Sequence, residues 1–181
     1  VVSTGKAEGK KALVISKGLL VPFNLYNLKE GIYRISNQLY VYQSFAAQID
    51  VVNSINPVTF AYSILFETNG NGKIISSADT FNFQYEQNKW LNITQIIDFD
   101  ANLVEVFIEN TFIGKLKYSD SDLQINSLRF SGINDSTAFF IDDICIRRAG
   151  CRDTIDTDEK VCLYPGKELN IGIARCKGYT F

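Results

Sequence analysis

Hydrophobic and polar residues alternate one by one along most of this chain, and a period of two is typical of β-strands with one face toward a core. The clearest case is the segment 32–42, in which Tyr33, Ile35, Leu39 and Val41 share one face. Polar side chains and two tyrosines fill its other face. The pattern therefore predicts a strand that packs in a core on the first face and meets solvent on the second.

The same alternation returns after the single tryptophan. There it predicts two strands whose core faces carry Leu91, Ile93, Ile97, Phe99, Val104, Val106 and Ile108. Over the whole chain we predict strands at 12–16, 19–23, 32–42, 45–52, 58–67, 73–76, 79–85, 90–99, 103–109, 123–132 and 138–147. Turns are predicted at 24–31, 53–57, 69–72 and 110–114, of which the Asn-Gly repeat at 69–72 is the strongest hairpin signal. Strand signals at this spacing, without a convincing helix, predict an all-β, two-sheet antiparallel jelly-roll sandwich.

Composition changes this prediction little but excludes several functions. The chain has 181 residues, 46% of them hydrophobic, which is enough for a real core. Its net charge of -2 is spread along the sequence, so we expect no nucleic-acid partner, which would need a concentrated basic face. No apolar run is long enough for a membrane span. The absence of histidine removes the commonest general base and most zinc sites.

The cysteines gather near the end of the chain, at Cys145, Cys151, Cys162 and Cys176. Their spacing does not match a zinc knuckle, and an even number in a polar segment is typical of disulfides formed in an oxidising compartment. Sequence alone cannot choose among the three pairings. We favour Cys145 with Cys151 and Cys162 with Cys176, because short loops close most easily.

The chain changes character where these cysteines begin. The segment after residue 150 is acidic and rich in loops, and it ends in two short strand-like stretches. We therefore predict a jelly-roll sandwich over residues 1–149. Residues 150–181 would form a linker and the start of a second β unit, as a short disulfide-bearing extension.

Four segments carry a resemblance to a known group of proteins. They are GIYRIS from Gly31, WLNITQIIDFD from Trp90, VEVFIENTFIG from Val104 and FIDDI from Phe140. Their order resembles that of the concanavalin A-like, laminin-G-like jelly-roll modules of large secreted and surface proteins of Bacteroidota. The opening GKKALVIS from Gly9 and the closing IDDI are also similar to family 4- and 22-type carbohydrate-binding modules, and the tail resembles the start of an Ig-like repeat.

The resemblance covers about residues 9–147, as judged from the strand pattern. It implies a non-catalytic module that is extracellular or at the cell surface, with neighbouring domains on the same polypeptide as partners. Many relatives of this kind are lectin-like and bind a polysaccharide or other glycan. Function argued from fold alone is an analogy, so residues must carry the rest.

Aromatic rings beside amides are the candidate ligand site. A ring face covers the apolar CH groups of a sugar, and amides pair with its hydroxyls. Tyr40, Tyr42 and Gln38 share one strand face, and Asn82 and Gln84 share a face of another strand. The sequence does not show whether the two faces adjoin. The nearby tryptophan, at position 90, opens a central strand and is expected to pack in the core.

The strand acids do not resemble catalytic carboxylates. Glu105 and Glu109 are four residues apart and would face the same way, about 13 Å apart. That is too far for a retaining glycosidase pair and long for an inverting one. Laminarinase-like enzymes of this fold class carry a Glu-x-Asp-x-x-Glu strand, which is absent here. We expect a solvated strand face and no enzyme activity.

A second pair of acids suggests a metal. Asp142 and Asp143 are adjacent in a predicted strand, so one of them must face the core or a sheet edge, where a carboxylate needs a cation or donors. In the modules that this chain resembles, the matching acid helps to hold a structural Ca²⁺, and Glu8 would add an oxygen. The alternative is that the two acids accept from backbone NH groups or pair with Arg147 or Arg148.

Two functions remain open. The first is a non-catalytic, secreted, glycan-binding module within a larger extracellular protein. The second is a structural or adhesive module of a cell-surface protein or extracellular assembly, with no small ligand. A surface groove lined by aromatic side chains would favour the first, because the second function needs none.

Overall fold

A computed structural model describes residues 12–118, 123–132, 134–149 and 160–162. Within these ranges the chain forms antiparallel strands and no helix. The strands are β1 (Leu13–Ser16), β2 (Leu20–Leu28), β3 (Ile32–Val41), β4 (Ala47–Ile55), β5 (Val58–Phe66), β6 (Asn71–Ser76), β7 (Thr80–Gln84), β8 (Trp90–Asp98), β9 (Leu103–Ile108), β10 (Thr111–Lys117), β11 (Ile125–Ser131), β12 (Ala138–Ala149) and β13 (Lys160–Cys162). Among the described residues there is no long apolar helix of the kind that crosses a membrane.

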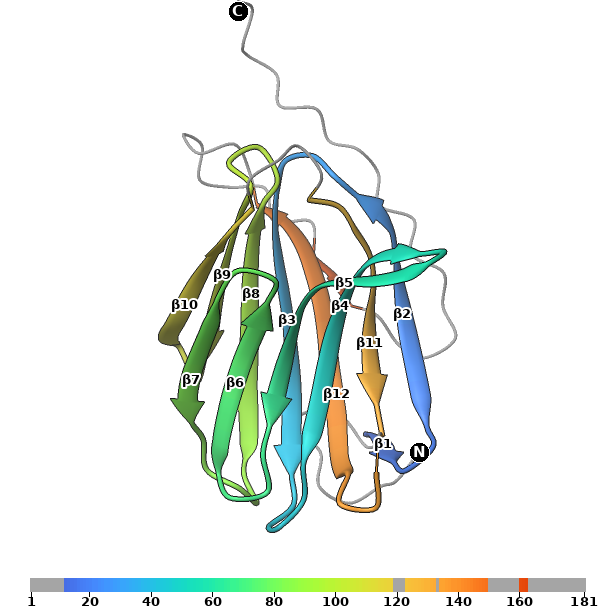
Figure 1. The fold of residues 1–181 in the computed structure, drawn as a ribbon, viewed down its shortest axis with the longest axis vertical. Coiled ribbons are helices and arrows are strands. Elements are labelled where there is room, and N and C mark those ends of the chain that lie inside the picture. Colours follow the sequence, from blue (N-terminus) through green and yellow to red (C-terminus); the bar gives the residue numbers. More distant parts are fainter. Residues whose placement is uncertain (1–11, 119–122, 133, 150–159, 163–181) are drawn as a thin grey trace, which may run out of the picture.

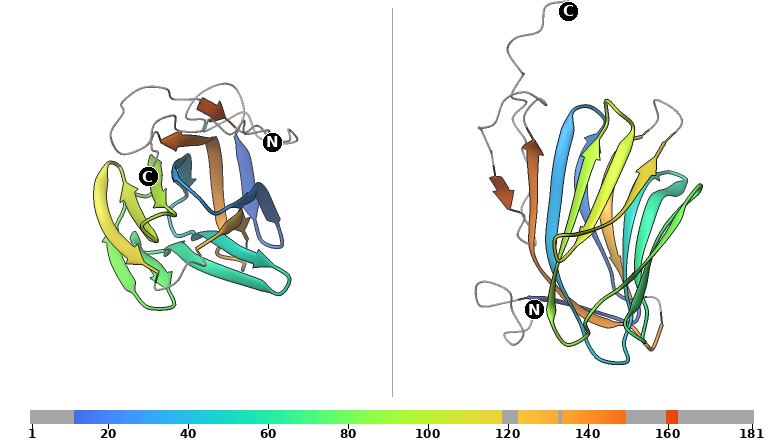
Figure 2. Two further views of the ribbon diagram at one scale, coloured as in Figure 1. Left: turned by 90° about the horizontal axis from the view of Figure 1, so that it is seen from above. Right: turned by 90° about the vertical axis from the view of Figure 1, so that its left-hand side faces the viewer.

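The strands form two facing sheets (Figures 1 and 2). One has the order β1-β12-β3-β8-β9-β10, with β13 added beside β12. The other has the order β2-β11-β4-β5-β6-β7. Neighbours that are distant in sequence, such as β3 and β12, pair in the middle of the first sheet. The predicted two-sheet antiparallel sandwich is confirmed.

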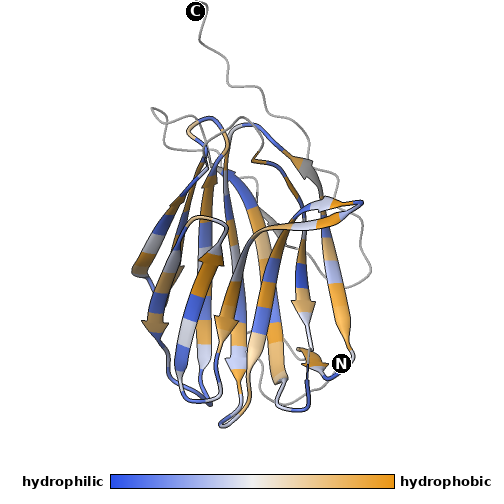
Figure 3. Cartoon of the chain, viewed as in Figure 1, coloured by the Kyte–Doolittle hydropathy of each residue, from blue (hydrophilic) through white to orange (hydrophobic). Residues whose placement is uncertain are grey.

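The core lies between the sheets and follows the alternation in the sequence. Figure 3 shows hydrophobic and hydrophilic bands succeeding one another along the strands. The residues predicted to face the core are buried: Tyr33, Ile35, Leu39, Val41, Leu91, Ile93, Ile97, Phe99, Val104, Val106 and Ile108. Burying apolar area at about 25 cal/mol per Å² is the main stabilising term for such a fold. One polar pair crosses this core, where the Tyr62 hydroxyl donates to Gln95 Oε1 at 2.6 Å.

Several predicted boundaries are wrong, for local reasons. The predicted loop 24–31 is mostly the second half of β2, which pairs with β11 as an edge strand. The predicted turn 110–114 is instead the start of β10, because Glu109 and Asn110 make the turn with φ of 50° and 63°. Two consecutive positive φ values are typical of a tight hairpin turn that matches strand twist.

A charged group also stabilises the outer face of the second sheet. Asp50 on β4 is fully buried and lies beside Arg129 of β11, whose Nη2 is 3.0 Å from Asp50 Oδ2. Ser63 and Gln48 each donate to the other carboxylate oxygen at 2.7 Å. A buried carboxylate with this many donors is fully paired, as a buried charge must be.

The predicted second unit, 150–181, lies outside the described residues except for β13. This short strand pairs antiparallel with β12, opposite Cys145 and its two following residues. The domain boundary at residue 149 stays a prediction.

Candidate functional site

An aromatic row crosses the outer face of the first sheet. Tyr40 on β3 has Trp90 of β8 and Phe140 of β12 as its register partners on either side. Because Leu39 and Leu91 point into the core, their neighbours Tyr40 and Trp90 point away from it. Ring centroids lie 5.6 Å apart between Tyr40 and Trp90, and 6.0 Å apart between Tyr40 and Phe140.

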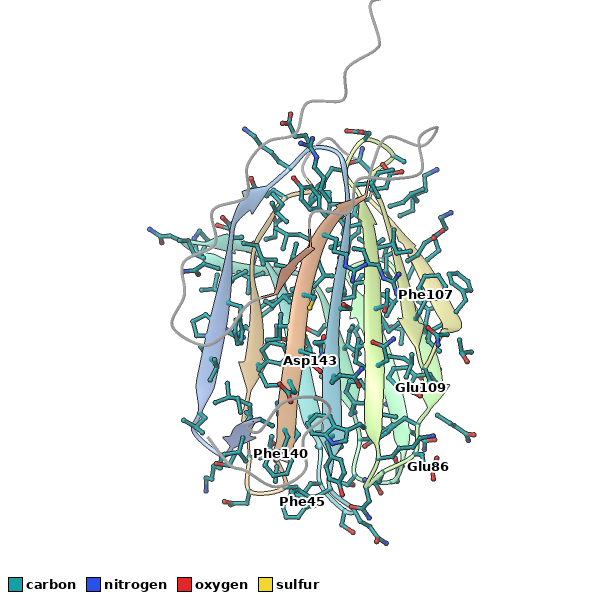
Figure 4. All side chains as sticks on the ribbon, turned by 180° about the vertical axis from the view of Figure 1, so that it is seen from behind. Phe45, Glu86, Phe107, Glu109, Phe140 and Asp143 are labelled. Atoms are coloured by element: carbon teal, nitrogen blue, oxygen red, sulfur yellow. The ribbon has the colours of Figure 1, made fainter. Side chains whose placement is uncertain are left out.

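Tyr42 extends the row just beyond the end of β3. Its ring is 5.3 Å from that of Tyr40 and 5.4 Å from that of Phe140. It is 39% exposed, whereas Phe140 is almost covered. Phe45, in the following loop, is 6.4 Å from Tyr42. Figure 4 shows Phe45 and Phe140 close together at one end of this face.

A polar row lies next to the aromatic row. Gln38 and Asn92 are register partners two residues before Tyr40 and two after Trp90. Asp142 of β12 is the partner of Gln38 on the other side. The amides of Gln38 and Asn92 are therefore adjacent to the half-buried rings of Tyr40 and Trp90. We call the set Gln38, Tyr40, Tyr42, Trp90 and Asn92 the aromatic–amide surface.

The loops at this end of the sandwich are tied together by a few polar groups. The Asn88 backbone NH donates to the Val41 carbonyl at 2.8 Å, and Asn88 Oδ1 accepts from the Gln43 NH at 2.9 Å. Gln87 Nε2 donates to the carbonyls of Tyr42 and Thr68, at 3.4 and 3.2 Å. The backbone that carries Tyr42 is therefore fixed on both sides of the ring, which reduces the ordering cost of binding there.

The other two predicted ligand residues lie on the other sheet. Asn82 and Gln84 belong to its edge strand β7, where both are exposed on one face, as predicted. They line an open pocket of about 630 Å³, together with Glu67, Asn71, Gly72, Lys73 and Phe83. Lys73 Nζ is 2.6 Å from Glu67 Oε1, so the charges in this pocket neutralise each other. The structure therefore does not join these amides to the tyrosines.

The paired acids lie at a β-bulge in β12. Between Asp142 and Cys145 the register with β3 shifts by one residue, and Asp143 has a φ of 49°. Both acids are half-buried, so neither is fully enclosed in the core. A bulge changes the direction of the chain, and with it the simple alternation of side chains on which the prediction was based. Asp142 Oδ1 accepts from the Asp143 NH at 2.9 Å, but its Oδ2 is buried without a hydrogen-bond partner.

A bound cation would give this unpaired oxygen of Asp142 a partner. Calcium takes six to eight oxygen ligands, and the described residues contain no group of three or more acidic, cysteine or histidine side chains that could hold a metal. Asp142 and Asp143 are two of the three predicted ligands. The third predicted ligand, Glu8, lies outside the described residues.

The strand acids have other partners. Glu105 pairs with Lys115 on β10, with Nζ 2.9 Å from Oε1. Glu109 is in the turn after β9, not in a strand, and its carboxylate accepts from the Asn92 backbone NH. The two glutamates therefore do not form the same-face pair that the alternation suggested.

The predicted disulfides are only partly within the described residues. Cys145 is buried on β12, and its Cα is the register partner of the Cα of Cys162 on β13. Cys151 and Cys176 lie outside the described residues. The favoured pairing of Cys145 with Cys151 stays a prediction. The register places the backbones of Cys145 and Cys162 opposite each other, and a bond between these two is one of the alternatives that the sequence left open.

Trp90 and Asn92 are the residues that the sequence interpretation missed. Trp90 was expected in the core but is half-buried on the outer face, in contact with Tyr40. The signal was present, because Leu91 and Ile93 were assigned to the core, and their neighbours Trp90 and Asn92 must then face outward. Phe45 and Phe140 have no comparable signal, because loop conformation and strand pairing bring them to the site.

Comparison with solved structures shows which proteins share this fold. A sialidase matches 75% of this chain at 12% identity, with a TM-score of 0.58. A fructofuranosidase of Schwanniomyces occidentalis complexed with fructosylnystose matches 77% at 12% identity, with a TM-score of 0.57. The binding domain of botulinum neurotoxin DC in complex with SialylT matches 75% at 19% identity, with a TM-score of 0.50.

These similarities show the fold of this chain but not its function. The chain corresponds to only 15%, 32% and 37% of the lengths of the three proteins. At such identities they show the fold, a two-sheet β-sandwich that occurs in enzymes and in a toxin's binding domain alike. The sequence matches no protein-family model and no curated protein. The function must therefore be argued from the surface described above.

Proposed function

We propose that this chain is a non-catalytic glycan-binding module whose ligand lies on the aromatic–amide surface. The observation that carries this proposal is the pair of adjacent rows: partly exposed rings of Tyr40, Tyr42 and Trp90 beside the amides of Gln38 and Asn92. A sugar has both an apolar CH face and a rim of hydroxyls. A surface with rings on one row and amides on the next matches both.

Support for a non-catalytic role comes from the acids. The full sequence has no histidine. Among the described residues, Glu105 is held by Lys115 and Asp50 by Arg129, while Glu109 accepts from a backbone NH. Glycoside hydrolysis needs two carboxyl groups at a set separation around one sugar bond. These three acids have partners within the chain and do not form such a pair. Incubation with polysaccharides should release no new reducing ends.

The test is binding to immobilised glycans, followed by affinity measurement with the best of them. Tyr42→Ala should weaken binding by about 1–3 kcal/mol, the range for removing a key aromatic contact. Phe112→Ala is the matched control, because Phe112 is also exposed but lies on the edge strand β10. Equal affinity of the Tyr42→Ala variant and wild type would remove the proposed site. Absence of binding to every glycan would favour the structural or adhesive alternative.

We also propose that the module works outside the cell, at the surface or secreted, as part of a larger protein. The support is the even number of cysteines near the end of the sequence, with the backbones of two of them opposite each other on β12 and β13. Titration of thiols in the native protein tests this. We expect none to react, and four reactive thiols would place the chain in a reducing compartment.

Finally, we propose a structural Ca²⁺ at the bulge of β12, with Asp142 and Asp143 among its ligands. The support is the buried oxygen of Asp142 that has no hydrogen-bond partner. A bound cation would neutralise this carboxylate and stabilise the bulge beside the aromatic–amide surface.

A further inference from the structure

The backbone register of β12 places a second cysteine opposite Cys145. Cys145 and Cys162 of β13 are Cα partners in an antiparallel pair, and Figure 2 shows β13 beside β12. Directly opposite residues in such a pair have Cα atoms about 4.5 or 5.5 Å apart, depending on the hydrogen-bond pattern, and share a face of the sheet. A disulfide needs Cα atoms about 4.4–6.8 Å apart. Either form of the pair is therefore compatible with a disulfide.

The course of β12 argues against the cysteine that is nearer in sequence, Cys151. The strand stays extended after Cys145, because its register with β3 continues to Ala149, the partner of Ile32. Four residues at the usual strand rise place the Cα of Ala149 about 13 Å from that of Cys145. The two steps from Ala149 to Cys151 span at most about 7 Å.

A return to Cys145 over so short a length is not possible for a chain beside a strand. A straight reversal would leave the two Cα atoms about 6 Å apart, but it would overlap the strand itself. The chain must also move sideways by about 4.8 Å, the spacing of neighbouring strands. That movement uses up much of the available length and leaves the two Cα atoms too far apart for a disulfide.

We infer that Cys145 and Cys162 form a disulfide that joins the C-terminal extension to the last strand of the sandwich. The inference rests on the proposed location outside the cell and adds which cysteines are joined. The two thiols lose two protons and two electrons as the S–S bond forms, and a small-molecule disulfide accepts them and is released as two thiols. Cys151 and Cys176, outside the described residues, are then left as the second pair.

This bond protects an edge of the first sheet. β1 pairs with β12 only as far as Ile141, and β13 pairs with residues 145–147, beyond the bulge. β13 has three residues, which is too short for stable pairing without support. An open strand edge is a template for pairing with other chains, so a covalent link that keeps β13 in place lowers the risk of aggregation.

Peptide mapping of the full chain tests the pairing directly, because trypsin separates the four cysteines. Cleavage after lysine and arginine places them on peptides 130–147, 149–152, 161–167 and 176–177. The protein is secreted from its expression host, blocked with N-ethylmaleimide at slightly acidic pH to prevent exchange, and digested without reductant. We expect peptide 130–147 linked to 161–167, and 149–152 linked to 176–177, with both links lost after reduction.

Two variants with three cysteines each give a matched comparison. Cys162→Ser should leave one reactive thiol per chain after denaturation, and the label should lie on peptide 130–147. Cys151→Ser should also leave one reactive thiol, but the label should lie on peptide 176–177, with Cys145 still protected.

The other outcomes have separate meanings. A link from peptide 130–147 to 149–152 or to 176–177 would overturn the inference and keep the proposed location outside the cell. Four labelled cysteines in the secreted wild-type protein would overturn both. The mapping of the wild-type protein needs no variant, so the result does not depend on whether a variant folds.

Discussion

At the scale of single residues, exposure separates the rings that would contact a ligand from those that support them. Tyr42 is 39% exposed, while Phe140 beside it is 4% exposed. Truncating Tyr42 removes contact area from the surface, whereas truncating Phe140 would leave a void under two tyrosines. Only the first change reports on binding without a large effect on stability.

A tyrosine in the neighbouring loop gives a prediction about pH. Burial raises the pKa of Tyr85 to about 12, with the Glu67 carboxylate acting in the same direction and a hydrogen bond with Gln87 opposing it. Between its ordinary value of 10 and this value, the folded state keeps a proton that the unfolded state has lost. The free energy of unfolding should therefore be unaffected by this group below pH 10 and fall as pH rises toward 12.

Denaturant unfolding at a series of alkaline pH values measures this effect. Tyr85→Phe should lose some stability at neutral pH, because the hydroxyl donates to the Glu67 carbonyl at 2.6 Å. It should also show a shallower alkaline fall than wild type, although buried Tyr62 and partly buried Tyr118, whose pKa values are raised by burial, still contribute. Parallel pH dependence of the two proteins would show that Tyr85 does not cause the fall.

The sequence predicted part of the site at this scale. Alternation alone placed Gln38, Tyr40 and Tyr42 on one outer face, because period-two patterns follow directly from strand geometry. The same rule applies to Trp90, but its size and hydrophobicity suggested a core position. A large aromatic side chain can be half-buried on an outer face when other rings cover it, as Tyr40 does here.

At the scale of elements, bulges and turns separate the sequence prediction from the structure. The bulge in β12 adds one residue opposite β3 and changes which way Asp143 faces. Local sequence does not reveal it, because a bulge depends on the pairing of strands far apart in the chain. The turn at Glu109 and Asn110 was predicted too late in the chain for a local reason. The Asn110-Thr111 pair fits either a turn or the start of a strand.

Contact between two edge strands gives the next prediction. β7 and β10 are edges of opposite sheets and meet along one side of the sandwich. A Cβ at Gly114 on β10 would lie 2.5 Å from the Phe81 ring of β7. Gly114→Ala should therefore destabilise the protein by about 1–3 kcal/mol, the usual cost of overpacking.

A double-mutant cycle identifies the cause. Phe81→Leu removes the ring that the new methyl group would meet, so the double variant should lose less stability than the sum of the two single variants. Strictly additive losses in chemical denaturation would contradict a clash between the new methyl group and the Phe81 ring.

At the scale of the whole molecule, the two sheets divide the residues that sequence grouped together. Asn82 and Gln84 are on the edge strand of one sheet, and the tyrosines are on the outer face of the other. The alternation indicates a face but not which sheet it belongs to, because sheet order depends on long-range pairing such as that of β3 with β12. The fold class could therefore be predicted from the sequence. Of the site, only the residues that β3 brings to its outer face could be predicted.

The proposed Ca²⁺ predicts a stability that depends on free ion concentration. A ligand that binds only the folded state raises stability as its concentration exceeds its dissociation constant. EDTA should lower the melting temperature of the wild-type protein, and added Ca²⁺ should restore it. Asp142→Asn should melt at one temperature under both conditions. A wild-type melting temperature indifferent to chelator and to Ca²⁺ would remove the metal and leave Asp142 as a hydrogen-bond acceptor.

The central claim is that a glycan binds on the aromatic–amide surface, and intrinsic fluorescence tests it most directly. Trp90 is the only tryptophan in the chain and lies in this surface, so its emission reports on the site alone. Titration with a soluble glycan that the protein binds should shift or quench this emission in a saturable way. The dissociation constant should equal that from an independent affinity measurement with the same glycan. Tyr42→Ala should raise the dissociation constant in both measurements. Binding that leaves the Trp90 emission unchanged would place the ligand elsewhere and contradict the account.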